Sequence, residues 1–396
     1  MEWKEVRLGD VCSELSDGLH KAPKFIVNGE YIFVNAKNLY NGYILDNDPT
    51  KKTSHEEYLK YKKPLGKHTI LYSIDGTIGN IAKYRGEKCV LGKGACYINC
   101  NPEIVESSYL YYQLQSPHFK SYIHLMSTGS TIKHISLKTM RDYVFELPSL
   151  DDQRRIASIL SSLDRKIELN NKINADLEEM AQAIFKNWFV DFEPFKDGKF
   201  VDSELGMIPE GWKVGTLEDI AEITMGQSPA GNSLNENREG MIFYQGSSDF
   251  GFRFPSIRVF TTEPKRLAVA NSVLFSVRAP VGDINVVKEE CCIGRGVASI
   301  KSKYGHDSYL FYTMKSLHKL FDSFDGEGTV FGSINKKTLS AIQILLPSDG
   351  IVEQFNNIAS SFDNRIRSLS DENSRLSLLR DTLLPRLMSG EIEIPE

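Results

Sequence analysis

The pattern of apolar positions is clearest in the middle of the chain, between Asp151 and Phe192, where no glycine or proline occurs. The apolar residues recur there with a period near 3.5, which is typical of a helix that packs lengthwise on another helix. In heptad notation, position a holds Ile156, Leu163, Asn170, Leu177 and Ile184, and position d holds Ile159, Lys166, Ile173 and Met180. We therefore expect a long helix over residues 151–192. Asn170 either fixes the register of this helix against its partner or lies at the solvent-exposed edge of the pair.

The same pattern returns near the end of the chain, over residues 348–390. Position a holds Phe355, Phe362, Leu369, Leu376 and Leu383, and position d includes Ile358 and Leu379. At an offset of 199 residues the two heptad patterns stay in phase, and each follows a Leu-Pro-Ser, at 147–149 and at 346–348. The predicted helix–helix interface consists of Ile156, Ile159, Leu163, Ile173, Leu177, Phe355, Phe362, Leu369, Leu376 and Leu383.

The blocks that precede these helices are also related to each other. Short β-like runs recur in the same order in residues 1–150 and 210–347, separated by turn-forming residues. Matching segments are Ile32-Phe33 with Ile242-Phe243, Leu71-Tyr72-Ser73 with Leu274-Phe275-Ser276, Gly92-Lys93-Gly94 with Gly294-Arg295-Gly296, and Tyr109–Tyr112 with Tyr309–Tyr312. The repeat predicts an α+β protein with two mixed α/β domains, 1–150 and 210–347, separated by two long helices, 151–192 and 348–390, in an antiparallel coiled coil. Residues 193–209 form the expected linker.

Charge is distributed unevenly along the chain. The net charge of the 396 residues is −5. Residues 151–205 and 348–396, which contain the two predicted helices, carry −4 each, whereas residues 1–150 carry +3 and residues 206–347 carry 0. The blocks could therefore present a surface for DNA, while the helices are better suited to contact protein. No apolar run reaches the roughly 20 residues needed to cross a membrane.

Four longer segments follow one another in a characteristic order: LPSLDDQRRIASILSSLDRKIELNN at 147–171, NWFVDFEPF at 187–195, PEGWK at 209–213 and RLMSGEI at 386–392. In these segments and their order the chain resembles the specificity (S) subunits of type I restriction–modification systems. The second copy, LPSDGIVEQF, lacks the counterpart of the pair Arg154-Arg155. The resemblance spans nearly the whole chain.

This resemblance implies a non-catalytic subunit whose two target recognition domains each bind one half of a bipartite target in double-stranded DNA. It further implies that the helices set the spacer and dock methylation subunits, two of them, and that a restriction motor–nuclease subunit joins for cleavage. No cofactor or metal is expected in this chain; S-adenosylmethionine, ATP and Mg²⁺ are expected in the partner subunits. A cytoplasmic protein of a bacterium or archaeon, with no membrane partner, is expected.

Two rival hypotheses come from the residues themselves. Asp249, Glu263 and Lys265 have the outline of a metal-dependent nuclease, in which carboxylates hold Mg²⁺. The first block has no counterpart of these residues. The other rival is a coiled-coil scaffold without DNA binding.

Base recognition needs Arg, Lys, Asn, Gln, Ser and Thr side chains on exposed loops. In the repeat, the segment at Asn35 to Asn38 corresponds to the segment at Gln245 to Ser248, and Lys93 corresponds to Arg295. Matching loops with different side chains suit two domains that recognise different sequences. The predicted DNA-binding residues are Asn35, Lys37, Asn38, Lys93, Lys133, His134, Gln245, Ser247, Ser248, Arg278 and Arg295.

Overall fold

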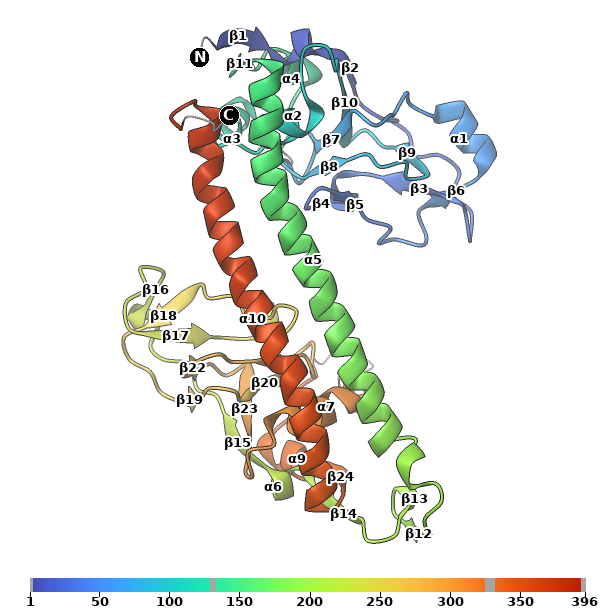
Figure 1. Ribbon diagram of the computed structural model, residues 1–396, viewed down its shortest axis with the longest axis vertical. Coiled ribbons are helices and arrows are strands. Elements are labelled where there is room, and N and C mark those ends of the chain that lie inside the picture. The colour runs from blue at the N-terminus through green and yellow to red at the C-terminus, as the bar shows by residue number, and fades with distance from the viewer. Residues whose placement is uncertain (1–2, 129–132, 325–331, 393–396) are drawn as a thin grey trace. The chain divides into compact units, whose positions relative to one another are not determined.

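The computed structural model describes residues 3–128, 133–324 and 332–392, which belong to two compact units (Figure 1). The first unit comprises residues 1–169 and 371–396, and the second comprises residues 170–370. Each unit contains one globular domain and about half of each of two 40-residue helices, α5 (Leu150–Phe189) and α10 (Asp349–Met388). The boundary between the units therefore crosses both helices.

Local signals explain where α5 begins and ends. The Ser149 hydroxyl accepts a hydrogen bond from the Asp152 backbone N–H (3.2 Å) and donates one to Asp152 Oδ2 (2.7 Å), which caps the first turn. The helix ends before Phe192, whose φ of 56° lies in the left-handed region. The observed helix thus covers 150–189 where the sequence predicted 151–192.

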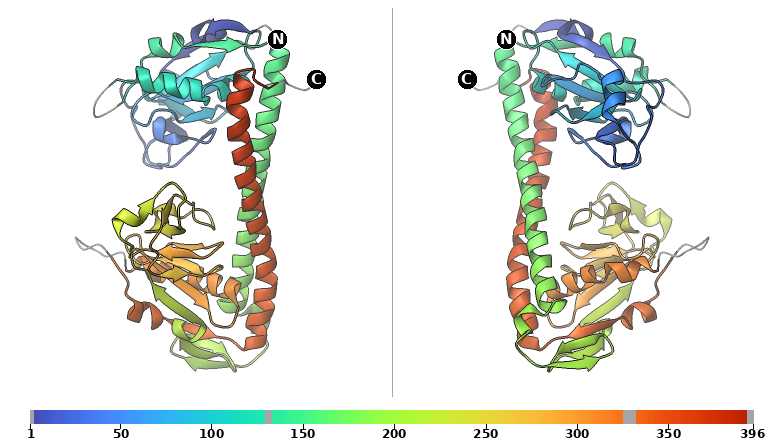
Figure 2. Two further views of the ribbon diagram at one scale, coloured as in Figure 1. Left: turned by 90° about the vertical axis from the view of Figure 1, so that its left-hand side faces the viewer. Right: turned by 90° about the vertical axis from the view of Figure 1, so that its right-hand side faces the viewer.

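Within each unit the two helices contact each other and run antiparallel (Figure 2). In the first unit, Arg380 Nη1 of α10 lies 2.8 Å from Asp164 Oδ1 of α5. In the second unit, the rings of Phe185 from α5 and Phe355 from α10 lie 5.5 Å apart. The first half of α5 therefore meets the second half of α10 in one unit, and the reverse holds in the other.

The buried face of the helices is wider than the predicted helix–helix interface. Among the ten predicted interface residues, Ile156, Phe355 and Leu369 are buried, and Ile159, Leu163, Ile173, Leu177, Phe362, Leu376 and Leu383 are half-buried. The predicted d positions Met180, Ile358 and Leu379 are wrong, because these side chains are 51%, 38% and 46% exposed. Residues outside the predicted interface are buried instead, namely Ala157, Leu160, Ala181, Phe185 and Phe189. They belong to the cores of the globular domains, so each helix packs on a domain as well as on the other helix.

Asn170 is fully buried, which rules out the hypothesis that it lies at a solvent-exposed edge.

The first globular domain is built on an antiparallel sheet, β2 (Cys12–Ser16), β10 (Ala95–Cys100), β7 (Thr69–Ser73) and β8 (Ile81–Lys83), in that order. A second sheet holds β6 (Lys52–Thr53), β3 (Tyr31–Val34) and β9 (Cys89–Leu91), with β3 and β9 parallel. The pairs β1 (Lys4–Arg7) with β11 (Val144–Leu147) and β4 (Leu39–Tyr40) with β5 (Tyr43–Ile44) complete the strands. The helices are α1 (His55–Tyr61), α2 (Ser107–Gln113), α3 (Pro117–Met126) and α4 (Leu137–Arg141).

The second globular domain repeats this topology. Its antiparallel sheet has the order β15 (Ala221–Met225), β23 (Val297–Ser302), β20 (Val273–Ser276) and β21 (Ile284–Val286). Its other sheet has the order β16 (Leu234–Asn235), β18 (Val259–Thr261), β17 (Met241–Tyr244), β22 (Cys291–Ile293) and β19 (Leu267–Ala268), with β17 and β22 parallel. The strand pair β14 (Lys213–Thr216) with β24 (Gln343–Leu346) corresponds to β1 with β11. The helices are α6 (Leu217–Ile220), α7 (Asp307–Ser316), α8 (His318–Asp322) and α9 (Lys336–Ser340).

The predicted linker is partly ordered into a hairpin, β12 (Phe200–Ser203) and β13 (Gly206–Pro209). In the described part of the chain, no helix is long and apolar enough to cross a membrane.

The core of each unit joins the sheet to both long helices. In the first unit, Tyr109 and Phe119 of the domain share one cluster with Leu160 of α5 and Leu387 of α10. In the second unit, the corresponding cluster joins Phe275 and Phe321 to Phe185, Phe189 and Phe355. Full burial of such a side chain contributes about 1.5–3 kcal/mol, so the helices are part of each domain's folding unit.

Candidate nucleic-acid interface

Four loops of the first domain converge at one edge of its sheets. Because β3 and β9 are parallel, their carboxyl ends lie together, and the Gly92 N–H donates to the Val34 carbonyl across them (2.8 Å). The chain leaving β7 joins the same edge, since the Ile74 N–H donates to the Gly94 carbonyl (3.1 Å). The chain that follows α3 closes the group, since the Ile135 N–H donates to the Ile74 carbonyl (2.9 Å). We call residues 35–38, 74–76, 92–94 and 133–134 the first loop cluster.

The first loop cluster brings together most of the predicted DNA-binding residues of this domain. Lys37, Lys93 and Lys133 are exposed there, and His134 is half-buried. Asn35 is half-buried and lies over Gly92, where a Cβ would come within 2.2 Å of the Asn35 Oδ1. A side chain at position 92 would therefore displace the asparagine.

Asn38 is a correction to the predicted set. It is 7% exposed, and its amide is fully used inside the domain. Its Oδ1 accepts from the Asn35 N–H (2.9 Å), and its Nδ2 donates to the Leu45 carbonyl (2.9 Å) and to Asn47 Oδ1 (2.8 Å). Asn38 therefore stabilises the turn after β3 and presents no free polar group to a ligand.

Asp75 is a member of the cluster that the sequence analysis missed. Its carboxylate lies 3.9 Å from Lys93 Nζ and 3.8 Å from His134 Nδ1. The repeat offers a signal that could have found it, because the alignment that matches Ser73 with Ser276 also places Asp75 opposite Arg278.

The second domain forms the same structure, which we call the second loop cluster, from residues 245–248, 277–279, 294–296 and 333–334. The Gly294 N–H donates to the Tyr244 carbonyl (2.8 Å) and the Val277 N–H to the Gly296 carbonyl (3.0 Å), as in the first domain. The Ile334 N–H donates to the Val277 carbonyl (3.1 Å). The preceding residues 325–331 lie outside the described part of the chain, as do residues 129–132 in the first domain.

All five predicted residues of the second domain lie in this cluster. Gln245, Ser248, Arg278 and Arg295 are exposed and Ser247 is half-buried. The Ser228 hydroxyl donates to Gln245 Oε1 (3.0 Å), which holds the amide over Gly294 much as Asn35 lies over Gly92. Each domain thus presents cationic and amide groups at one edge, the groups that contact phosphates and base edges in DNA complexes.

The opposite ends of the strands in the second domain face the long helices, and a buried arginine fixes the domain there. Arg253 is 3% exposed, and its guanidinium contacts Glu178 Oε2 of α5 (3.1 Å) and Asp363 Oδ1 of α10 (2.7 Å). It also donates to the Tyr312 hydroxyl (2.9 Å) and lies 3.9 Å from the centroid of the Phe311 ring. Arg253 therefore joins one domain to both helices.

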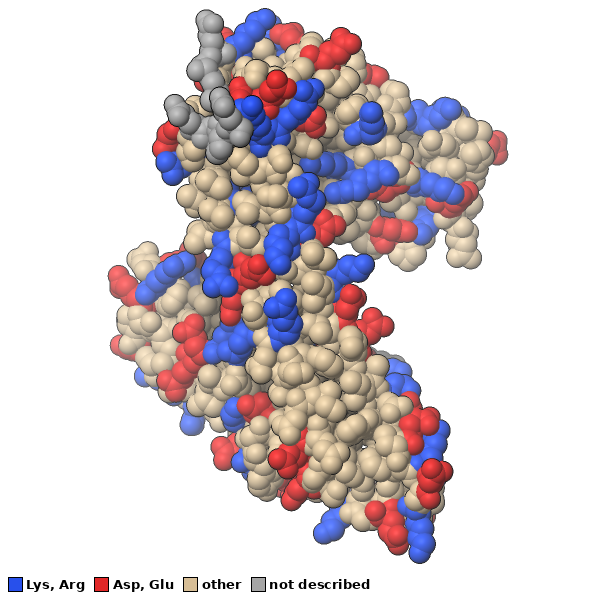
Figure 3. All heavy atoms as spheres, viewed as in Figure 1, with Lys and Arg blue, Asp and Glu red and all other residues tan. Residues whose placement is uncertain are grey.

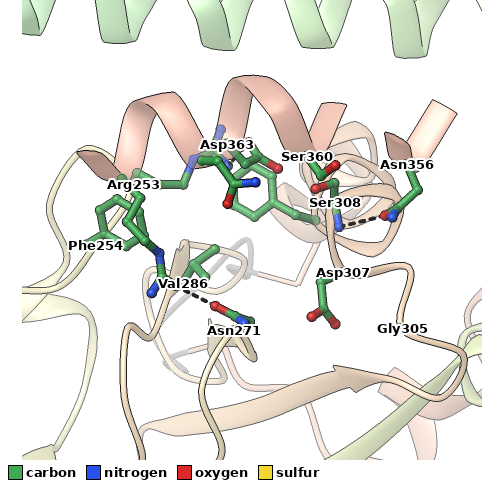
Figure 4. A pocket seen from close by; sticks show the side chains of 13 residues that line it. Arg253, Phe254, Asn271, Val286, Gly305, Asp307, Ser308, Asn356, Ser360 and Asp363 are labelled. Carbon is green, nitrogen blue, oxygen red and sulfur yellow. Dashed lines mark hydrogen bonds and ion pairs between the residues drawn. The ribbon is translucent and has the colours of Figure 1, made fainter. Parts of the chain in front are cut away.

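A pocket lies beside this arginine, between the second domain and α10 (Figure 4). Asp307 and Ser308 at the start of α7, Asn271 before β20, and Asn356 of α10 line it. The Asn356 Oδ1 accepts hydrogen bonds from the backbone N–H groups of Ser308 (3.2 Å) and Tyr309 (3.3 Å) and so caps α7. Since β20 and β23 each run between this pocket and the second loop cluster, the pocket lies at the helix side of the domain.

The first domain is fixed to the helices by different residues at the same place. The Tyr112 hydroxyl donates to Asp164 Oδ2 of α5 (2.6 Å), whose other oxygen binds Arg380 of α10. The Lys83 ammonium lies 4.4 Å from the centroid of the Tyr111 ring. Tyr111 is the counterpart of Phe311, so Lys83 takes the place that the Arg253 guanidinium has over the ring in the second domain. Burial is the main cause that lowers the pKa of Lys83 to about 8.

The residues of the nuclease hypothesis do not form a metal site. Asp249 is 5% exposed and forms an ion pair with Arg258, while Glu263 and Lys265 are exposed. Within the described ranges, no group of three or more His, Cys, Asp and Glu side chains is arranged to hold a metal ion.

Comparisons with known proteins cover both repeats. The family model described as the type I restriction modification DNA specificity domain matches residues 1–179 and 209–377. A protein of Methanocaldococcus jannaschii, assigned as the MjaX specificity subunit of a type I restriction enzyme, is 33% identical over 370 residues, which cover 89% of this chain and 83% of the relative. The specificity subunit of the type I restriction enzyme HindI from Haemophilus influenzae is 25% identical, covering 99% of this chain and 100% of the relative.

A solved structure shares the fold. The crystal structure of the S subunit of a type I restriction–modification system from M. genitalium superposes with a TM-score of 0.58 at 18% identity, covering 98% of this chain and 96% of that chain.

Proposed function

Because the chain belongs to the family of type I restriction modification DNA specificity domains, we propose that it selects the DNA target of a type I restriction–modification complex. Each globular domain binds one half of a bipartite target through its loop cluster. The observation that carries this proposal is the pair of loop clusters, which share one backbone arrangement and differ in their side chains. One frame with two sets of side chains is what a protein needs to recognise two different half-targets.

The long helices have two roles in this proposal. They form an antiparallel coiled coil that sets the spacer between the half-targets, and they dock two methylation subunits. Several large apolar side chains on them are exposed: Leu169 (52%), Met180 (51%), Ile358 (38%), Leu378 (69%) and Leu379 (46%). On the face in Figure 3, a broad area free of charged side chains covers the part of α5 and α10 that belongs to the second unit. Exposed apolar side chains and a surface with few charges are both typical of a protein-binding surface.

The chain itself is non-catalytic in this proposal. The methylation subunits supply S-adenosylmethionine, and a restriction motor–nuclease subunit with ATP and Mg²⁺ joins for cleavage. The complex acts in the cytoplasm of a bacterium or archaeon, where its double-stranded DNA target lies.

Three cations should contribute phosphate contacts. Substituting Lys93, Lys133 or Arg295 with Ala should each weaken DNA binding by the assembled complex and reduce the slope of log K against log salt by about one unit, since each contact releases about one counterion. The measurement is a salt titration of binding to target DNA. A variant with all three residues replaced by Ala serves as the decisive case. Unchanged affinity and salt slope in this triple variant would show that the loop clusters do not face DNA.

An exchange of domains tests the proposed function. Replacing residues 1–147 with the matching block of another specificity subunit should change one half of the methylated motif and leave the other half intact. The exchange ends at Leu147-Pro148, where β11 gives way to α5. The motif is measured by methylation-sensitive sequencing of the host genome. A motif that changes in both halves, or in neither, would contradict independent recognition by the two domains.

A further inference from the structure

One position at the centre of both loop clusters carries opposite charges in the two domains. Asp75 follows β7 and Arg278 follows β20, and each lies one residue beyond the N–H that binds the central glycine turn, Ile74 to Gly94 (3.1 Å) and Val277 to Gly296 (3.0 Å). Each also forms a β-bridge with the chain that closes its cluster, Asp75 with His134 and Arg278 with Ser333. Three features of the backbone therefore agree on the equivalence: the place after the strand, the bond to the glycine turn and the β-bridge.

The Asp75 carboxylate is available to a ligand. Among the described residues it accepts no hydrogen bond, and the side-chain nitrogens of Lys93 and His134 lie 3.9 Å and 3.8 Å away, beyond hydrogen-bond range. Its side chain is 29% exposed. Unlike the Asn38 amide, the Asp75 carboxylate is therefore not engaged, within the described residues, in hydrogen bonds that stabilise the domain.

The Lys93 ammonium beside Asp75 explains how a carboxylate can lie on a surface that contacts DNA. Phosphates repel an isolated carboxylate, and this repulsion acts over about 10 Å at ordinary salt. Lys93 Nζ lies 3.9 Å from the Asp75 carboxylate, close enough to offset its charge. The carboxylate oxygens can then approach the bases.

Arg278 presents the complementary chemistry. It is exposed, and in the part of the chain that the structure describes its guanidinium forms no ion pair or side-chain hydrogen bond. The backbone beneath it is held, because the Ser276 hydroxyl donates to the Arg278 carbonyl (2.9 Å). In the described ranges the guanidinium donors are therefore free, while the backbone that carries them is held in place.

We propose that Asp75 and Arg278 are specificity-determining residues: Asp75 selects cytosine in one half-target, and Arg278 selects guanine at the equivalent place in the other. Asp75 accepts a hydrogen bond from the N4 amino group of cytosine, and Arg278 donates to O6 and N7 of guanine, both in the major groove. The inference rests on the proposed function and adds to it one named base contact in each domain.

The test uses the assembled complex with its methylation subunits. Asp75→Asn keeps the shape of the side chain, removes its charge and replaces one of its two acceptor oxygens with an amino donor. The resulting amide can accept from N6 and donate to N7 of adenine, so the variant should lose the preference for cytosine. Discrimination at one cytosine position of one half-target should fall by about 5- to 150-fold, the range for one good base contact. Arg278→Gln should relax one guanine position of the other half-target by a similar factor. The readout is the relative methylation rate of a library of targets that carry every single-base substitution.

Matched controls remove the same charges elsewhere. Glu103→Gln acts beyond the other end of β10, and Lys213→Gln acts on β14; both side chains are exposed. These two variants should retain the wild-type preferences at every position, and all four should copurify with the methylation subunits in wild-type yield. A variant of Asp75 or Arg278 that fails to assemble would show a structural role and overturn the inference for that residue.

The outcomes separate this inference from the proposed function. A wild-type complex without a bipartite preference would contradict the proposed function itself. A bipartite wild type whose preferences survive Asp75→Asn and Arg278→Gln would overturn only the inference. An effect of Asp75→Asn confined to an A·T position would overturn the cytosine assignment.

Discussion

Replacing Arg253 with methionine should destabilise the second unit by about 3 kcal/mol. Removing one partner of a buried ion pair typically costs about 3–5 kcal/mol, because the remaining charge is left buried. Here Lys315 still contacts Glu178, and Asp363 is 21% exposed and can gain water, so we expect the low end of that range. The Tyr312 hydroxyl also loses a donor.

Urea unfolding followed by tryptophan fluorescence measures this effect. Trp188 and Trp212 belong to the second unit, so a Trp3→Phe background makes the signal specific to that unit. Lys186→Met is the matched control, because Lys186 also lies in the second unit and its ion pair with Asp191 is exposed and should contribute less than about 1 kcal/mol. Equal, small effects of the two substitutions would show that the buried network does not hold the second domain to its helices.

Lengthening both helices by one heptad should lengthen the spacer of the methylated target. The insertions belong after Leu169 in α5 and after Ser370 in α10, where the two compact units divide, so that the interior of each unit is unchanged. Seven residues add roughly 10 Å at about 1.5 Å per residue. This corresponds to about three base pairs at roughly 3.4 Å each.

The two domains of the lengthened protein no longer match the rotation of the DNA between the half-targets, which should slow methylation. A heptad turns a helix by about 20° less than two full turns, whereas three base pairs turn DNA by roughly 100°. We therefore expect slower methylation, with both half-target sequences preserved and a longer spacer between them. The same insertion in α5 alone should prevent assembly, because it displaces one helix against the other. A variant that assembles and methylates with the original spacer would show that the helices do not set it.

The duplicated framework was predictable because it depends on local and periodic signals. Strand-forming runs, the glycine turns at 92–94 and 294–296, and the two heptad patterns all lie within short windows of the sequence. The predicted d positions failed at Met180 and Ile358 for a tertiary reason. A heptad pattern predicts contact with one neighbouring helix, and these helices also pack on a globular domain.

The residues that the sequence analysis missed or assigned wrongly depend on contacts between distant segments. Arg253 lies in an irregular segment, and its partners Glu178 and Asp363 are 75 and 110 residues away in the sequence. Asn38 has the composition of a base-recognising residue, and only its bonds to Leu45 and Asn47 show that its amide is already used. Side-chain type alone cannot distinguish a free polar group from one that stabilises a turn.

The central claim is that this one chain supplies both halves of a DNA target. It is tested most directly by methylation sequencing of a host that carries the methylation subunits with and without this chain. We expect a single bipartite motif, two specific half-targets separated by a spacer of fixed length, present only when the chain is expressed. A motif that persists without the chain, or one with a single continuous recognition sequence, would contradict the account.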